Sequence, residues 1–134
     1  MKNLYRAVLA AAALLALVLA APARQKVDLN KVAGSWSLEV NAGGEFYYLT
    51  LDLKVKDGKL EGGLTEQNGM FKDAPLAAIE FDGTTLKFDV TIPTPPDGGE
   101  RLVKTEMKLV EAKLEGMLTI ADLGLSAGVA GVKK

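Results

Sequence analysis

The 134-residue sequence contains no histidine and no cysteine. Their absence excludes Ser-His-Asp and Cys-His catalysis, a histidine general base and an ordinary zinc or copper site. An enzyme of this composition would depend on carboxylates, lysines or tyrosines. The acidic residues in strand-like segments alternate with lysines, a pattern typical of a solvated outer face. We therefore expect no catalytic residues, no metal and no cofactor, and we expect that the protein is not an enzyme.

The sequence also lacks a strong excess of either charge. Its formal net charge is −1, and no basic run stands out, so nucleic acid is not an expected partner. Without cysteine there is no disulfide framework, and the chain has no Asn-x-Ser/Thr glycosylation acceptor. In an exported chain, both absences are typical of a bacterial periplasmic or secreted protein.

Export is predicted by the N-terminus. The positively charged start Met1–Arg6 precedes an apolar run, Ala7–Ala21, and small residues that permit signal-peptide cleavage after Ala20 or Ala23. The alternative is an uncleaved membrane anchor, but a spanning helix needs about 20 apolar residues. We expect no stable membrane insertion after cleavage. The chain is thus divided into a signal peptide, an N-terminal leader and one β-barrel domain: 1–23, 24–33 and 34–134.

The rest of the chain alternates apolar and polar residues with period two, which indicates strands with one buried face. One phrase occurs twice, as KLEGGLT at Lys59–Thr65 and as KLEGMLT at Lys113–Thr119, each after another strand-like run. This repeat indicates that a hairpin unit is used twice. The expected strands are Gly34–Val40, Glu45–Lys56, Lys59–Thr65, Leu76–Phe81, Thr85–Ile92, Arg101–Val110, Lys113–Thr119 and Ser126–Lys134.

Eight short strands joined by tight turns predict an all-β, eight-stranded antiparallel up-and-down β-barrel. Closure removes the unpaired edges of an open sheet. Asp57-Gly58 is a strong two-residue hairpin signal. Gly62 and Gly116 occupy matching places in the two repeats, where a narrow barrel needs room or a sharp bend. The alternative architecture is a two-sheet sandwich.

Gly34-Ser35-Trp36, at the start of the first expected strand, resembles the Gly-x-Trp signature of the calycins: lipocalins, fatty-acid-binding proteins and avidins. In those barrels the tryptophan closes one end, and a basic side chain from near the last strand packs across it. The resemblance implies barrel closure by Trp36, with Lys133 in place of the more usual arginine. The phrase Asp57–Gly62 is similar to the hairpins of small exported lipocalin-like bacterial proteins, whose functions are mostly not established.

An eight-stranded barrel has the size at which side chains either fill the centre or leave room for one small ligand. The inward positions are almost wholly apolar, so we expect any ligand to be a small apolar molecule such as a lipid, fatty acid or pigment. A solid core made by the same side chains is the open alternative. The candidate lining residues are Trp36, Tyr47, Leu49, Leu51, Phe88, Val90, Met107 and Leu118.

A different function, protein–protein interaction, is also consistent with the sequence. Small exported barrels of calycin type include inhibitors of secreted proteases and envelope accessory factors. The polar leader Arg24–Lys31 and the loop Pro93–Gly99 are the two segments that could contact a protein partner, because binding residues collect on loops carried by a rigid scaffold. The sequence leaves both functions open.

Overall fold

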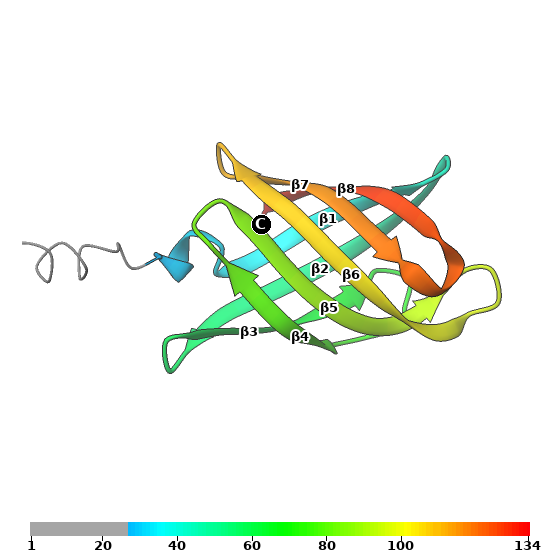
Figure 1. Cartoon of the computed structure of the whole chain (residues 1–134), viewed down its shortest axis with the longest axis horizontal. Coiled ribbons are helices and arrows are strands. Elements are labelled where there is room, and N and C mark those ends of the chain that lie inside the picture. Colours follow the sequence, from blue (N-terminus) through cyan, green and yellow to red (C-terminus); the bar gives the residue numbers. More distant parts are fainter. Residues whose placement is uncertain (1–26) are drawn as a thin grey trace, which may run out of the picture.

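The computed structural model of the protein describes residues 27–134. The expected signal peptide and the first part of the expected leader lie outside these residues, so export and cleavage stay predictions. The described residues form a closed antiparallel β-barrel in which each strand pairs with its neighbours in the chain and β8 pairs with β1 (Figure 1). The strands are β1 (Gly34–Ala42), β2 (Glu45–Lys56), β3 (Lys59–Glu66), β4 (Ala74–Phe81), β5 (Thr85–Thr94), β6 (Gly99–Val110), β7 (Lys113–Ile120) and β8 (Leu125–Lys133).

This architecture confirms the predicted eight-stranded up-and-down barrel and is consistent with a calycin-like fold. The alternation that predicted it is visible in the burial of β5, where Leu86, Phe88, Val90 and Ile92 point inward between more exposed neighbours. Strand ends differ from the expected ones by a residue or two, which is the usual uncertainty of such boundaries.

The turns explain why the chain reverses where it does. Asp57 and Gly58 have φ angles of 52° and 74°, the positive values that a type I′ hairpin turn requires. The equivalent turn between β6 and β7 has Glu111 at 50° and Ala112 at 69°, without a glycine. The first of these turns could be recognised from its residues, whereas the second depends on the strands on either side.

The repeated glycines mark places where neighbouring strands approach closely. A Cβ atom on Gly62 would collide with the carbonyl oxygen of Asp52, and one on Gly116 would collide with that of Glu106. Backbone atoms cannot move aside as a flexible side chain can. The repeat therefore preserves the same close approach of strands in two hairpins, where the sequence predicted a need for room or a sharp bend.

One expectation is wrong. The sequence predicts an exposed loop over Pro93–Gly99, but Pro93 and Thr94 continue β5 and Gly99 begins β6, with Thr94 paired to Gly99. The connection is a turn of residues 95–98. A proline close to the end of a hairpin removes only one N–H from the ladder, so the strand can extend through it.

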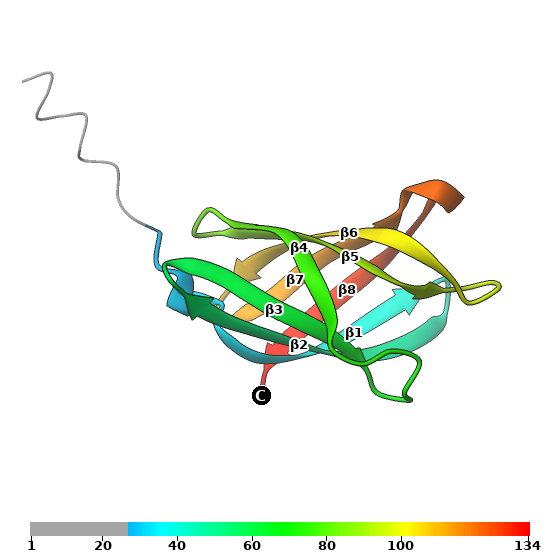
Figure 2. The same ribbon diagram turned by 90° about the horizontal axis from the view of Figure 1, so that it is seen from below.

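The pairing between β3 and β4 is short. Within residues 27–134, β3 and β4 pair only at Gly63 with Pro75 and at Leu64 with Ala74. Farther along, β4 contains an irregularity between Ala77 and Glu80 and diverges from β3 (Figure 2). The barrel is therefore closed, but the hydrogen-bonded ladder between β3 and β4 is short.

The up-and-down order gives the barrel two distinct ends. We call the closed end the one that carries the 3-10 helix η2 (Leu29–Lys31) and the turns after β2, β4 and β6. The open end carries the turn of residues 43–44, the segment 67–73, the turn of residues 95–98, and η3 (Ala121–Leu123) before β8. These two ends differ in how their interiors are filled.

Candidate functional site

The closed end is sealed by a plug of apolar side chains. Trp36 on β1 and Val32 after η2 are both fully buried, and the Trp36 indole Nε1 donates a hydrogen bond to the Val32 carbonyl oxygen at 2.8 Å. The indole N–H is thereby satisfied in a dry place, which an interior tryptophan requires. The chain that precedes β1 thus crosses the end of the barrel and closes it.

Lys133 covers the same tryptophan. Its Nζ lies 5.6 Å from the Trp36 ring centroid, within the range of a cation–π contact. Gly34 allows this approach, because a Cβ there would lie 2.9 Å from the Lys133 Cε and the glycine φ is 119°. The Gly-x-Trp motif and the lysine near the C-terminus therefore meet in space, in the arrangement that the calycin resemblance implies.

Next to this plug the barrel interior is solid. Five of the eight candidate lining residues lie here, each no more than 1% exposed, and none of them borders the cavity described below. They pack with other fully buried side chains such as Leu86 and Leu114. The five residues are Trp36, Leu51, Phe88, Val90 and Met107.

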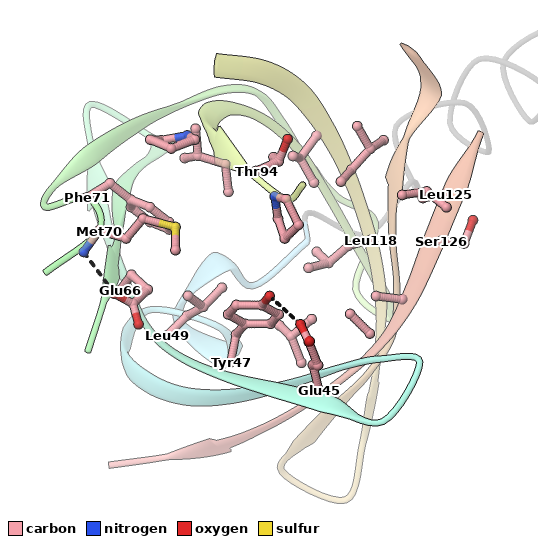
Figure 3. Close-up of a pocket in the computed structure, with 18 of the residues that line it drawn as sticks. Glu45, Tyr47, Leu49, Glu66, Met70, Phe71, Thr94, Leu118, Leu125 and Ser126 are labelled. Atoms are coloured by element: carbon pink, nitrogen blue, oxygen red, sulfur yellow. Dashed lines mark hydrogen bonds between the residues drawn. The ribbon is translucent and has the colours of Figure 1, made fainter. Parts of the chain in front are cut away.

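The open end contains a cavity of about 360 Å³. The other three candidate residues, Tyr47, Leu49 and Leu118, line it, and Figure 3 shows the lining side chains arranged around a central space. Most of the lining is aliphatic or aromatic, so the space favours apolar contents. Further lining residues are Val40, Ile92, Val103, Ile120, Leu125 and Ala127 from the strands, together with Met70 and Phe71 from segment 67–73.

Segment 67–73 forms one wall of the cavity because Glu66 holds it in place. The Glu66 side chain is 4% exposed, and its Oε2 accepts backbone N–H groups from Asn68 and Met70, each at 2.9 Å. These bonds bend the chain so that Met70 and Phe71 lie beside the cavity (Figure 3). A buried carboxylate is costly without such donors.

A second acidic group lies at the mouth. The Tyr47 hydroxyl donates a hydrogen bond of 2.9 Å to Glu45 Oε2, and both residues line the cavity (Figure 3). This hydrogen bond to a carboxylate raises the pKa of Tyr47 above its usual value, with smaller contributions from desolvation and from the charge of Glu45. The Tyr47 hydroxyl therefore keeps its proton and donates this hydrogen bond.

The hairpin between β5 and β6 forms another part of the rim. Arg101 binds Asp97 with two hydrogen bonds, Nη1 to Oδ1 at 2.7 Å and Nη2 to Oδ2 at 3.0 Å, and its Nη1 also lies 3.1 Å from the Thr94 hydroxyl. The guanidinium holds the pKa of Asp97 well below its usual range. Pro93, Thr94 and Pro95 face the cavity, while the ion pair fixes the turn that carries them.

Sequence reasoning missed Glu66, Met70, Phe71 and Thr94. A signal for Glu66 was present, since it continues the inward series Leu60, Gly62 and Leu64 on β3 and an inward charge in an apolar strand is unusual. Met70 and Phe71 are apolar residues in a segment that otherwise has the composition of a turn. Their position depends on hydrogen bonds to Glu66 that periodicity does not describe.

Among residues 27–134, no group of three or more acidic side chains is placed to hold a metal ion. No helix in that part of the chain is long and apolar enough to cross a membrane. No protein-family model matches the chain, and no curated protein matches it in sequence. The function must therefore be inferred from the barrel itself.

Proposed function

We propose that this protein is an exported, non-enzymatic, lipocalin-like carrier that binds one small apolar molecule at the open end of its barrel. The observation that carries the proposal is the contrast inside the barrel. One end is packed around Trp36 and Phe88, while the other retains about 360 Å³ of largely apolar space. That volume lies toward the small end of the range of about 300–1,000 Å³ that is typical of ligand pockets.

An apolar cavity of this kind is a poor site for water. Water needs two to four polar partners, whereas an apolar guest gains free energy by leaving solvent. The polar lining atoms, on Glu45, Tyr47, Glu66, Thr94 and Ser126, lie among a larger number of aliphatic and aromatic side chains. A ligand with a mainly apolar body and a small polar end fits this distribution.

The location that we propose is the bacterial periplasm or the exterior of the cell. Its support comes from the charged start and apolar run at the N-terminus, and from the absence of cysteine in the whole chain. A carrier in such a compartment would hold an apolar molecule that water does not dissolve well.

The test is native mass spectrometry of the protein purified without detergent from its own host. We expect a reproducible adduct of low molecular mass that is released on denaturation. The variant Leu118→Trp places an indole in the cavity and should remove the adduct. Met117→Trp is the matched control, because Met117 is the preceding residue on β7 and is exposed on the outer face. An unliganded wild-type mass, together with no binding of added apolar probes, would refute the proposal.

The second candidate function is protein–protein interaction. The observation in its favour is the β5–β6 hairpin, which projects at the open end and is fixed by the Arg101–Asp97 ion pair (Figure 1). A preorganised hairpin loses little conformational entropy when it binds a partner. Replacing residues 96–98, which do not line the cavity, with glycine and serine should abolish such an interaction and leave a small molecule in the cavity unaffected.

A further inference from the structure

The charges around the cavity indicate whether the polar end of its ligand is anionic or cationic. The lining contains two carboxylates, Glu45 and Glu66, and no lysine or arginine. The neutral polar groups of the lining, such as the Tyr47 and Thr94 hydroxyls, do not supply a positive charge. An anionic end inserted here would meet two like charges without a cation to neutralise them.

Arg101, at the rim of the open end, does not offset the negative charge of the cavity lining. Arg101 is engaged with both oxygens of Asp97 and with the Thr94 hydroxyl, and it does not belong to the lining. Removing it from that pair to bind an anion would leave the Asp97 carboxylate unpaired. The pair therefore contributes no net positive charge to the mouth.

The connecting segments at the open end add to the negative charge. Within residues 43–44, 67–73, 95–98 and 121–124, the basic residue is Lys72, and the acidic residues are Asp73, Asp122 and Asp97, of which Asp97 is neutralised by Arg101. Lys72 is exposed and is not part of the cavity lining. A cation that approaches the open end is thus attracted before it reaches Glu45 and Glu66.

Glu66 has the strongest influence, because it is 4% exposed and borders an apolar space. Within the described residues its side-chain hydrogen bonds all go to one oxygen, Oε2. The second oxygen, Oε1, is left with acceptor capacity. In a site of low dielectric, a charge-assisted hydrogen bond to this oxygen is stronger than the same bond in water.

We propose that the ligand is a cationic amphiphile: an apolar body with a positively charged, hydrogen-bond-donating end such as a primary amine. The amine lies near Glu66, whose cross-strand partner is Leu49, and the apolar part lies against other lining side chains such as Leu118. This inference rests on the proposed carrier function and narrows its ligand class. It disfavours fatty acids, which the sequence alone left as candidates.

The cavity volume sets the length of a suitable probe. At about 30 Å³ for each water-sized group, 360 Å³ holds about twelve such groups, so a saturated chain of about ten carbons fits. Decylamine, decan-1-ol and decanoate share this chain and differ in the charge of the polar end at pH 7. Their affinities can be measured by isothermal titration calorimetry below the concentrations at which they form micelles.

We expect decylamine to bind with one-to-one stoichiometry and at least about tenfold more tightly than decanoate, with decan-1-ol between them. Decanoate binding as tightly as decylamine would overturn the inference while leaving the carrier function in place. Failure of all three probes to bind would overturn the carrier function as well.

Two variants identify the source of the preference. Glu66→Gln removes the charge and keeps an oxygen that can accept the Asn68 and Met70 N–H groups, so the preference for decylamine over decanoate should fall by about tenfold. Glu115→Gln is the control, because it removes one negative charge from an exposed position on β7 near the closed end. An equal fall in both variants would show that only the overall charge matters, and would overturn the assignment to Glu66.

Discussion

The two ends of the barrel are made from the same strands and the same alternation of side chains, yet only one of them is filled. Leu51 and Leu49 are successive inward residues of β2; the first is completely buried in the packed end, and the second borders the cavity. At the closed end, Trp36 and Val32 add bulk from outside the regular pattern. At the open end, small residues such as Ala42 and Ala127 occupy lining positions. Whether an inward residue belongs to a core or to a cavity therefore depends on what lies across the barrel from it.

The largest expected effect comes from truncating one leucine at each end. Leu51→Ala should lower the free energy of unfolding by about 3–5 kcal/mol, because it opens a void in close-packed surroundings. Leu49→Ala removes the same atoms beside an existing cavity, where fewer contacts are lost, so we expect a cost of about 1–2 kcal/mol. Chemical denaturation of both variants measures the difference. Equal losses would show that the cavity is not open in solution.

A smaller effect is expected at the boundary between the two ends. Thr105 lies on β6 between Val103 of the cavity and Met107 of the core, and its Oγ1 is buried without a hydrogen-bond partner within residues 27–134. Thr105→Val should raise the free energy of unfolding by about 1–2 kcal/mol, because it removes an unsatisfied polar group and keeps the shape. Thr91→Val on the outer face of β5 is the control and should change little. A loss of stability in Thr105→Val would indicate a buried water bound to the hydroxyl.

Substitutions in the plug at the closed end should change the free energy of unfolding by a smaller amount. Lys133→Ala removes the cation above Trp36 and should lower the free energy of unfolding by about 0.5–1 kcal/mol. Lys133→Arg should retain or increase stability, because a planar guanidinium stacks on an aromatic ring. Thermal denaturation followed by Trp36 fluorescence measures both variants. An arginine variant less stable than the alanine variant would contradict a cation–π contact.

The smallest effect concerns the rim of the open end. The pKa of Asp97 is lowered by Arg101, so the folded state favours the charged carboxylate. Its contribution is present above the unfolded pKa of about 3.9 and is lost as the pH falls through the lower folded value. A carboxyl NMR titration should show Asp97 still ionised at pH 3. In Arg101→Met its pKa should return toward the ordinary value, and an unchanged titration would show that the ion pair does not form in solution.

The barrel itself could be predicted because its signals are local. Alternation places the strands, Asp57-Gly58 places a turn, and the repeated Lys-Leu-Glu-Gly phrase marks a hairpin used twice. The Pro93–Gly99 loop was predicted at the wrong length, because proline was given more weight as a strand breaker than its place at the end of a hairpin justifies.

The candidate site was predicted less completely, for a physical reason. Alternation states which face a residue occupies, but it carries no information on depth along the barrel. Tyr47, Leu49 and Leu118 therefore could not be separated from Leu51 or Phe88. The wall formed by segment 67–73 depends on Glu66, whose role appears only when its backbone partners are known.

The short ladder between β3 and β4 has a consequence for how the molecule behaves in a crowded solution. Lys59–Gly62 of β3 lies beyond the two pairs that join it to β4, so this part of the barrel keeps the edge that closure normally removes. Lys59 and Glu61 place charges along that edge, and the irregular stretch of β4, with Ala78 at a φ of 51°, gives an incoming strand no straight template. We therefore expect resistance to aggregation to depend on these few residues more than on the closed shape of the barrel.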